Sequence, residues 1–450
     1  MKNLFKKAFL ALCIISIAAC SDDDDTTFIP PTTTIADLVA DNAEYSSLLA
    51  ALERTDLDVT LNGTGTFTVF APDNDAFADF LDGTPLNDVP VATLEQILLN
   101  HVLGTTVTSG QLTTGYVNNL ATESSTSANL SMYINTSNGV VINGVSTVVQ
   151  ADVAASNGII HFVDEVIPLP TMLTFVAADS DLSSLATTAT TTSGFDTDFA
   201  AVLSGADSNL TLLAPDNDAF AALGDISGLS AADLEQILLN HVIGGINIST
   251  GLATGYGNTL ATYGDTMNNL SIYINTDGGV SFNGISNVST ADIVASNGVI
   301  HKVDAVITLP TVVTFAIADA TFSTLVAALT TLTPSTDFAG ILSTALGTDP
   351  APFTVFAPTD DAFAAITVPT DENDIAAILN YHVVGGANVR STDLTDGAVT
   401  TLNGDVTIDA SAPSVTGAGN TSASNIIVVD VQAANGVIHA IDQVLLPAAN

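Results

Sequence analysis

The sequence predicts an α+β protein of three tandem domains, and three observations support this prediction. A stretch that begins Asn-Gly and continues with β-branched residues occurs at 157–167, 297–307 and 435–445. Apolar strand patterns and helical patterns precede every copy. The copies recur with a regular spacing, because His161 and His301 are 140 residues apart and His301 and His439 are 138 apart. This period is too long for a solenoid repeat and matches a common domain size, so each unit can bury its own core.

The repeated stretch predicts a central strand that is buried on both faces. Asn-Gly favours a turn because both residues tolerate positive φ. The β-branched run that follows has apolar residues on both faces and ends at a proline. One histidine and one aspartate are built into this apolar strand in every copy, at His161, Asp164, His301, Asp304, His439 and Asp442.

The first 19 residues are predicted to be a signal peptide. Lys2, Lys6 and Lys7 form a basic start, and the apolar run that follows is too short to span a bilayer. The run ends Ile-Ala-Ala-Cys20, which resembles the lipobox of bacterial lipoproteins. That resemblance implies cleavage before Cys20 and lipidation of its sulfur. The alternative is an ordinary secretory signal with an incidental cysteine.

Residues 20–31 are predicted to link this lipidated cysteine to the first domain. Four consecutive aspartates, Asp22 to Asp25, are typical of a solvated tether, and they also resemble the acidic export signal of some bacterial lipoproteins. Such signals direct bacterial lipoproteins to the outer face of the outer membrane, so we expect an outer-membrane lipoprotein exposed on the cell surface. The predicted domains span 32–170, 171–310 and 311–450.

The charge balance excludes some partners. The chain has 48 acidic and only six basic residues, with a formal net charge of −42. Such a field repels nucleic acid and anionic membrane surfaces, so we expect membrane contact only through the lipid anchor. Only 12% of residues are charged and 47% are hydrophobic, so the acids decorate folded domains.

A short apolar strand followed at once by a helix occurs near the start of each unit. Ala-Pro ends each strand, and the next residue has N-cap chemistry, which predicts helix caps at Asp73, Asp216 and Thr359. A metal site is the alternative reading of these acidic segments. The glycine and distal glutamate of an EF-hand loop are absent, which favours capping.

A third element begins at Leu94, Leu234 and Ile375 and has the pattern of a helix closed by a C′ glycine. His101, His241 and His382 lie seven residues after these starts, on the predicted apolar stripe. A mostly β region follows, with an Asn143-Gly144 hairpin. The third unit instead carries a Gly/Ser/Ala-rich insertion around 413–425, which we expect to be a surface loop.

The three motifs in this order resemble the fasciclin domain family. The run 354–363 resembles its first homology box, 435–447 resembles its second, and Tyr381-His382 matches the Tyr-His pair between them. The resemblance covers residues 32–447 in three copies. It implies a β-sandwich wedge with packed helices, in which the two boxes supply neighbouring central strands. The first two units depart from it, with Asn100 and Asn240 in place of the tyrosine.

The six histidines could serve in catalysis or metal binding, but their positions favour a structural role. A histidine in a buried strand or on an apolar stripe is usually hydrogen bonded within the core. The sequence has no His-x-x-x-His motif, nucleophile elbow, P-loop or dinucleotide fingerprint. We therefore expect no metal, no cofactor and no enzymatic activity.

The remaining interpretation is a stiff, surface-displayed rod, since short proline-containing segments join the units. The resemblance implies adhesion to extracellular matrix, polysaccharide or a surface protein through weak multivalent contacts. One alternative is a glycan-capture lipoprotein that serves a polysaccharide uptake system, and another is a hydrolase with an unrecognised site. The chain has no Trp and only seven Tyr, which gives little material for the aromatic platforms of glycan capture.

Overall fold

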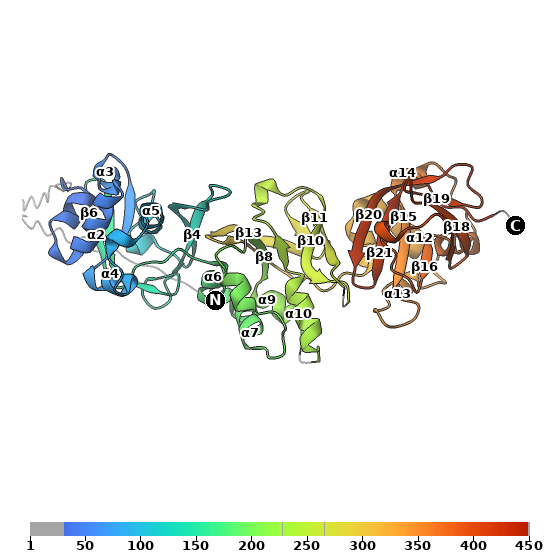
Figure 1. Ribbon diagram of the computed structural model, residues 1–450, viewed down its shortest axis with the longest axis horizontal. Helices are drawn as coiled ribbons and strands as arrows, with labels where there is room; N and C mark the ends of the chain where they lie inside the picture. The colour runs from blue at the N-terminus through green and yellow to red at the C-terminus, as the bar shows by residue number, and fades with distance from the viewer. Residues whose placement is uncertain (1–30, 227, 265, 449–450) are drawn as a thin grey trace, which may run out of the picture.

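The computed structural model describes residues 31–226, 228–264 and 266–448. Three domains lie in a row along the long axis of the molecule (Figure 1). The predicted signal peptide, Cys20 and the acidic tether lie outside the described residues, apart from Pro31.

Each domain combines one seven-stranded sheet with a group of short helices. The helices of the first domain are α1 (Ile35–Ala40), α2 (Ser46–Arg54), α3 (Leu57–Asn62), α4 (Asn74–Leu81) and α5 (Val91–Leu99). Its strands are β1 (Phe67–Pro72), β2 (Val102–Leu103), β3 (Gly115–Thr122), β4 (Asn129–Asn135), β5 (Val141–Ile142), β6 (Ser146–Ala155) and β7 (Gly158–Val163).

The second domain repeats this order. Its helices are α6 (Met172–Ala178), α7 (Ser183–Thr191), α8 (Phe199–Ser204), α9 (Asn217–Leu223) and α10 (Ala231–Leu239). Its strands are β8 (Leu210–Pro215), β9 (Val242–Gly244), β10 (Gly255–Thr262), β11 (Asn269–Asn275), β12 (Ser281–Phe282), β13 (Ser286–Ala295) and β14 (Gly298–Val303).

The third domain follows the same plan. Its helices are α11 (Val312–Ala318), α12 (Ser323–Thr330), α13 (Phe338–Leu342), α14 (Asp360–Ala364) and α15 (Glu372–Asn380). Its strands are β15 (Phe353–Pro358), β16 (Val383–Gly385), β17 (Gly397–Thr401), β18 (Gly404–Asp409), β19 (Ser414–Gly417), β20 (Ser424–Ala433) and β21 (Gly436–Ile441). The predicted α+β fold is thereby confirmed.

The two motif strands of each domain pair in parallel at the centre of the sheet. In the first domain β1 pairs with β7 from Phe67 opposite Gly158 to Pro72 opposite Val163, and the sheet order is β2-β1-β7-β6-β5-β4-β3. The third domain has the same order, and the second closes into a barrel where Thr259 of β10 pairs with Ile243 of β9. The prediction that these strands are neighbours is confirmed.

A β-bulge divides each sheet into the two halves of a wedge. The start of β6 pairs with β5, whereas most of its length pairs with β7, and the register shifts between Gln150 and Val153. Asp152 lies in the bulge with φ 63°, and Asp292 and Asp430 repeat this left-handed conformation. The extra residue bends the strand and increases its twist, which lets one strand serve both halves.

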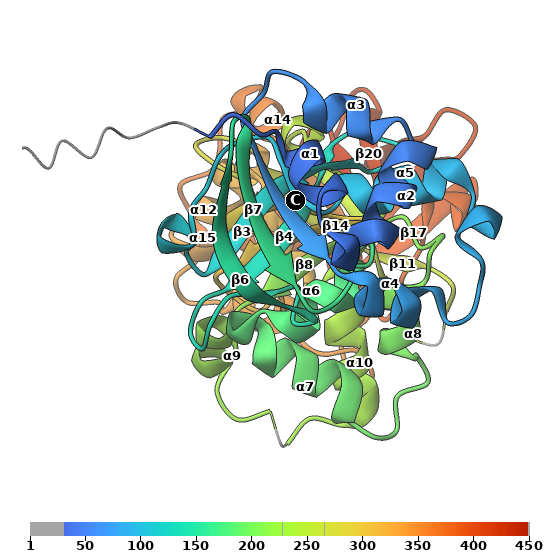
Figure 2. The ribbon, with the colours of Figure 1, turned by 90° about the vertical axis from the view of Figure 1, so that its left-hand side faces the viewer.

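Two apolar cores flank the central strands and explain why these strands are apolar on both faces. In the first domain Val69 and Ala71 of β1 face a core formed with the helices. Phe70, between them, points into a second core inside the wedge, with Met132 and Val163. In Figure 2, helices α2, α4 and α5 lie on one side of β6 and β7. Helices α7 and α9 of the second domain lie on another side of the row, so successive domains are rotated about its long axis (Figures 1 and 2).

Three local predictions were wrong. Apolar residues three and four apart over 35–49 predict a single amphipathic helix, but the side chain of Asn42 caps a short 3-10 turn that separates α1 from α2. Helix α5 ends at Leu99, so Gly104 does not close it, and residues 102–103 form strand β2. The predicted surface loop around 413–425 contains strand β19, whose Val415 is fully buried.

At the Asn-Gly turn before the central strand of the first domain, the glycine has the expected positive φ (155° at Gly158), but the asparagine acts by another mechanism. No positive φ is found at Asn157, whose amide instead joins three segments. It accepts a hydrogen bond from Ile35 N at 3.0 Å and donates to Leu61 O at 2.6 Å and Gly63 O at 3.1 Å. A Cβ at Gly158 would collide with the carbonyl oxygen of Phe67, so glycine is required by the close approach of β1.

Among the described residues, no single helix has the length and apolar character needed to cross a membrane. A bent pair, Val312–Ala318 with Ala320–Thr330, meets the criterion jointly by length and composition alone, with 97° between its halves.

Candidate functional site

In each domain a histidine follows the helix α5, α10 or α15 and caps the C-terminal end of that helix. His101 is 3% exposed, and its Nδ1 lies 2.7 Å from Ile97 O, one of the last carbonyls of α5. Its Nε2 accepts a hydrogen bond from Ile167 N at 2.8 Å, so Nδ1 carries the proton and donates to the carbonyl. His101 therefore caps the helix, and burial lowers its pKa to about 4.

The same arrangement recurs in the other domains. His241 and His382 each contact the carbonyl four residues earlier and accept from Ile307 N and Leu445 N, both at 2.8 Å. Burial lowers the pKa of each to about 4. Both ring nitrogens are used in all three, which leaves none to bind a metal or to act as a base.

The strand histidines support the bulge with the opposite tautomer. His161 Nδ1 accepts from Asp152 N at 3.2 Å, and Nε2 donates to Val107 O at 3.0 Å. His301 and His439 repeat both bonds, and burial lowers their pKa values. The two histidines of a domain therefore tie different elements together and share no hydrogen bond.

The strand aspartates and the predicted caps also bond locally. Asp164 Oδ1 accepts from Thr147 N at 2.6 Å, and Asp304 and Asp442 bind the matching backbone at 2.7 Å. Asp73, Asp216 and Thr359 are N-caps of α4, α9 and α14. Within the described ranges no three His, Cys, Asp or Glu residues are arranged to hold a metal ion.

A group of hydrogen-bonded polar side chains lies at each junction between domains, and the sequence analysis did not predict it. Tyr116 of β3 donates its hydroxyl hydrogen to Asp179 Oδ2 of the next domain at 3.0 Å, and its ring lies edge-on to Phe175. Tyr256 repeats this with Asp319 at 2.9 Å and Phe315. Burial, followed by the adjacent carboxylate, raises the pKa of both tyrosines, so each stays protonated and donates.

Hydrogen bonds between serine side chains and backbone amides fix the same junctions. Ser131 Oγ of β4 accepts from Val294 N of β13 at 3.0 Å, and Ser271 accepts from Gln432 N at 2.9 Å. A signal for the junctions was present in the sequence. The junction tyrosines recur in the first two units, at 116, 133, 256 and 273, whereas the paired positions of the third are Ala398 and Thr407.

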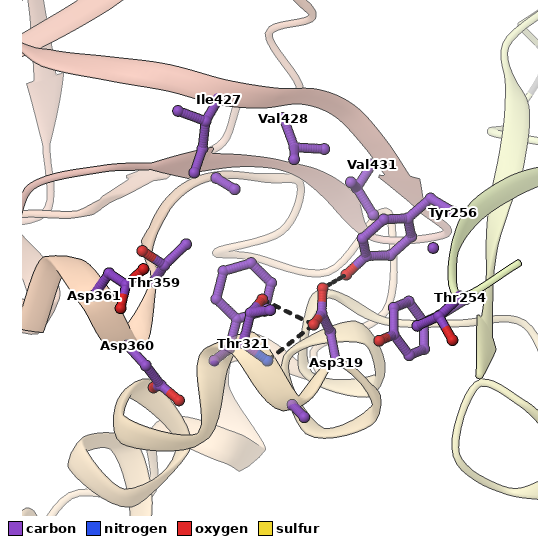
Figure 3. Close-up of a pocket in the computed structure, with 15 residues that line it drawn as sticks. Thr254, Tyr256, Asp319, Thr321, Thr359, Asp360, Asp361, Ile427, Val428 and Val431 are labelled. Carbon is purple, nitrogen blue, oxygen red and sulfur yellow. Dashed lines mark hydrogen bonds between the residues drawn. The ribbon is translucent and has the colours of Figure 1, made fainter. Parts of the chain in front are cut away.

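The second junction contains a pocket of about 690 Å³ that is open to solvent, a volume typical of ligand sites (about 300–1,000 Å³). Figure 3 shows the Tyr256–Asp319 hydrogen bond at one side of the pocket, with Ile427 and Val428 opposite. Asp360 and Asp361 lie farther along the wall. The pocket thus combines carboxylates with an apolar wall.

The domain plan and the junctions define a class of protein, a tandem array of α+β wedge domains in direct contact. Comparison with known proteins gives the family. The fasciclin domain model matches residues 43–170, 181–310 and 320–447. The chain belongs to the fasciclin domain family.

Several relatives match at moderate identity. Transforming growth factor-beta-induced protein ig-h3 of Sus scrofa is 30% identical over 442 residues, which cover 92% of this chain and 58% of that protein. Human periostin is 30% identical over 334 residues, which cover 72% of this chain and 37% of that protein. Protein sll1483 of Synechocystis sp. is 41% identical over 145 residues, which cover 31% of this chain and 74% of that protein. The chain therefore spans less than two thirds of the first two relatives.

A solved structure also matches, that of a FAS1 domain pair from the insect cell adhesion molecule fasciclin I. It is 19% identical, with a TM-score of 0.39, and the match covers 59% of this chain and 97% of that chain.

Proposed function

We propose that this chain is a non-enzymatic adhesion protein that a lipid at Cys20 holds on the outer face of the outer membrane. Its partners would be extracellular matrix, polysaccharide or a surface protein. The observation that carries the proposal is the repeated junction, which holds three like domains in a row. Linked modules gain effective concentration, so weak contacts at each domain add up to firm attachment.

The chemistry of the described residues supports a binding role. Every histidine uses both ring nitrogens in structural hydrogen bonds. The net charge of −42 favours basic or neutral partners over nucleic acid.

The test compares a deletion strain with strains that carry one-, two- and three-domain forms, and measures attachment and aggregation. Attachment is expected to rise steeply with domain number. The variant Cys20→Ser should release the protein into the soluble fraction, because it removes the sulfur that would carry the lipid, and several acyl chains together are what make such anchoring stable. Normal attachment in the deletion strain, with growth lost on one polysaccharide, would contradict adhesion and favour glycan capture.

A further inference from the structure

The two junctions share a tyrosine–aspartate pair but differ in what lies beside it. At the first junction Lys302 of β14 reaches the pair. Its Nζ lies 3.1 Å from Asp179 Oδ2 and 3.1 Å from Asp181 Oδ2, and its side chain is 10% exposed. Burial lowers its pKa, but the two carboxylates outweigh that effect and raise it, so the ammonium stays charged. The first junction thus contains its own cationic ligand.

The second junction lacks that cation. Ala440 of β21 takes the place of Lys302, since each follows the strand histidine and lies opposite an alanine of the parallel partner strand, Ala357 and Ala214. Asp319 is only 7% exposed and accepts hydrogen bonds from Tyr256 and Thr321. Among the described residues, no lysine, arginine or histidine lies within 4.0 Å of it in an ion pair. With alanine at this position, the 690 Å³ pocket lies beside a carboxylate that is hydrogen bonded but has no paired cation among the described residues.

In the first domain, which no described domain precedes, both the capping residue and the residue at the position of Lys302 differ. Asn42 stands where the other units have Asp179 and Asp319, as the cap of the same 3-10 turn. Phe162 stands where Lys302 does, and it stacks on Tyr45 at 4.3 Å. In the first domain a neutral capping residue occurs with an apolar residue at the position of Lys302. In the second domain an acidic capping residue occurs with the lysine itself. The third domain keeps one of the two acids, Asp319, without a lysine, and Thr321 stands where Asp181 does.

A second change builds an apolar wall beside the same carboxylate. Ile427 and Val428 of β20 line the pocket and are 53% and 39% exposed. The matching residues of β13 are Ser289 and Thr290, because Val428 pairs with Ala440 as Thr290 pairs with Lys302. An apolar wall next to a buried carboxylate suits a side chain with an aliphatic stem and a cationic end.

We propose that the second junction pocket binds a lysine side chain presented by a partner polypeptide. Its ammonium would take the place that Lys302 takes at the first junction and pair with Asp319. Its stem would pack on Ile427 and Val428, and the pocket leaves room for the flanking residues. This deepens the adhesive function proposed above and rests on it for the partner in the cell, whereas binding in solution tests the pocket by itself.

The experiment measures binding of a Gly-Gly-Lys-Gly-Gly peptide to the full-length protein in detergent, by calorimetry at about 0.15 M ionic strength, where distant charges are screened. The same peptide with norleucine in place of lysine should not bind. The variant Asp319→Asn should weaken binding by about tenfold or more, the effect of one charge-assisted hydrogen bond. The variant Ala440→Lys supplies an internal ligand, as at the first junction, and should abolish binding while the protein remains folded.

The control is Asp79→Asn, which removes the same charge from an exposed site on α4 and should leave binding unchanged. Equal weakening by Asp79→Asn and Asp319→Asn would show attraction to the acidic surface as a whole and overturn the proposal. Undiminished binding by folded Ala440→Lys would overturn it as well. If n-butylamine bound as tightly as the peptide, the pocket would serve small amines, and the assignment to a polypeptide would be wrong.

Discussion

The residue before the helix-capping histidine differs between the first two domains and the third, and its hydrogen bonds show why. Asn100 donates to Ile167 O and Pro168 O at 3.1 and 3.0 Å, on the segment that leads into the second domain. Asn240 makes the matching bonds to Ile307 O and Thr308 O, both at 3.2 Å. The third domain has Tyr381 at this position, and its hydrogen bonds stay within the third domain. The Tyr381 hydroxyl donates to Asp405 O and accepts from Ala418 N.

In the third domain another residue holds the matching segment. Asn420, from the segment after β19, donates to Val444 O at 2.9 Å and accepts from Leu446 N at 2.7 Å. The insertion of the third domain therefore replaces the asparagine of the other two. Asn100 and Asn240, which depart from the family pattern, thus hold the segment that leads into the next domain, whereas Tyr381 bonds within its own domain.

The largest effect should come from forcing the third domain into the pattern of the first two. Tyr381 is 2% exposed, so Tyr381→Asn leaves a cavity and removes one hydrogen-bond partner from each of two backbone groups. We expect the third domain to lose about 3–5 kcal/mol of unfolding free energy, as for other large-to-small core changes. Hydrogen exchange of β18 and β19 measures it. The control Tyr381→Phe keeps the ring and should lose only about 1–3 kcal/mol. Equal losses of unfolding free energy for Tyr381→Asn and Tyr381→Phe would contradict the prediction that packing of the ring stabilises the third domain.

A smaller effect is expected at the junction itself. Asn240→Ala leaves the carbonyls of Ile307 and Thr308 without this partner, which should cost about 1–3 kcal/mol in the second domain. Hydrogen exchange should also rise in the segment 305–311 and at the start of α11, because that segment joins the two domains. Asn258→Ala, on the exposed part of β10, is the control. Exchange that rises equally in both variants would contradict a specific role of Asn240 at the junction.

The sequence predicted what depends on local pattern and missed what depends on neighbouring domains. The strand with His161, its parallel partner and the α+β class follow from periodicity, turn residues and the family resemblance. The end of α5 was misplaced because apolar residues flank Asn100 and His101 on both sides, at the end of the helix and in β2. The pair of Tyr256 and Asp319 joins residues 63 positions apart in different domains, and no local pattern marks such a pair. Only a comparison of the three units reveals it.

The smallest predicted effect concerns pH and tests whether His382 is a neutral cap, as the shared geometry of the three domains requires. Burial lowers its folded-state pKa to about 4, whereas an unfolded histidine titrates near 6.5. Between these values the unfolded chain binds more protons, so stability is lost as pH falls from about 6.5 toward 4. From pH 7 to pH 5.5 the expected loss from this residue is about 1 kcal/mol.

Urea unfolding at the two pH values measures this loss, and the transition that Tyr381→Asn shifts identifies the third domain. Glutamine offers a donor and an acceptor but does not titrate, so His382→Gln should remove about 1 kcal/mol from the pH dependence of that transition. His439 still titrates in the variant, so some dependence remains, and the informative quantity is the difference between wild type and variant. An identical pH dependence in the two proteins would mean that His382 is not held neutral by burial. The capping account of the three helix-end histidines would then fail.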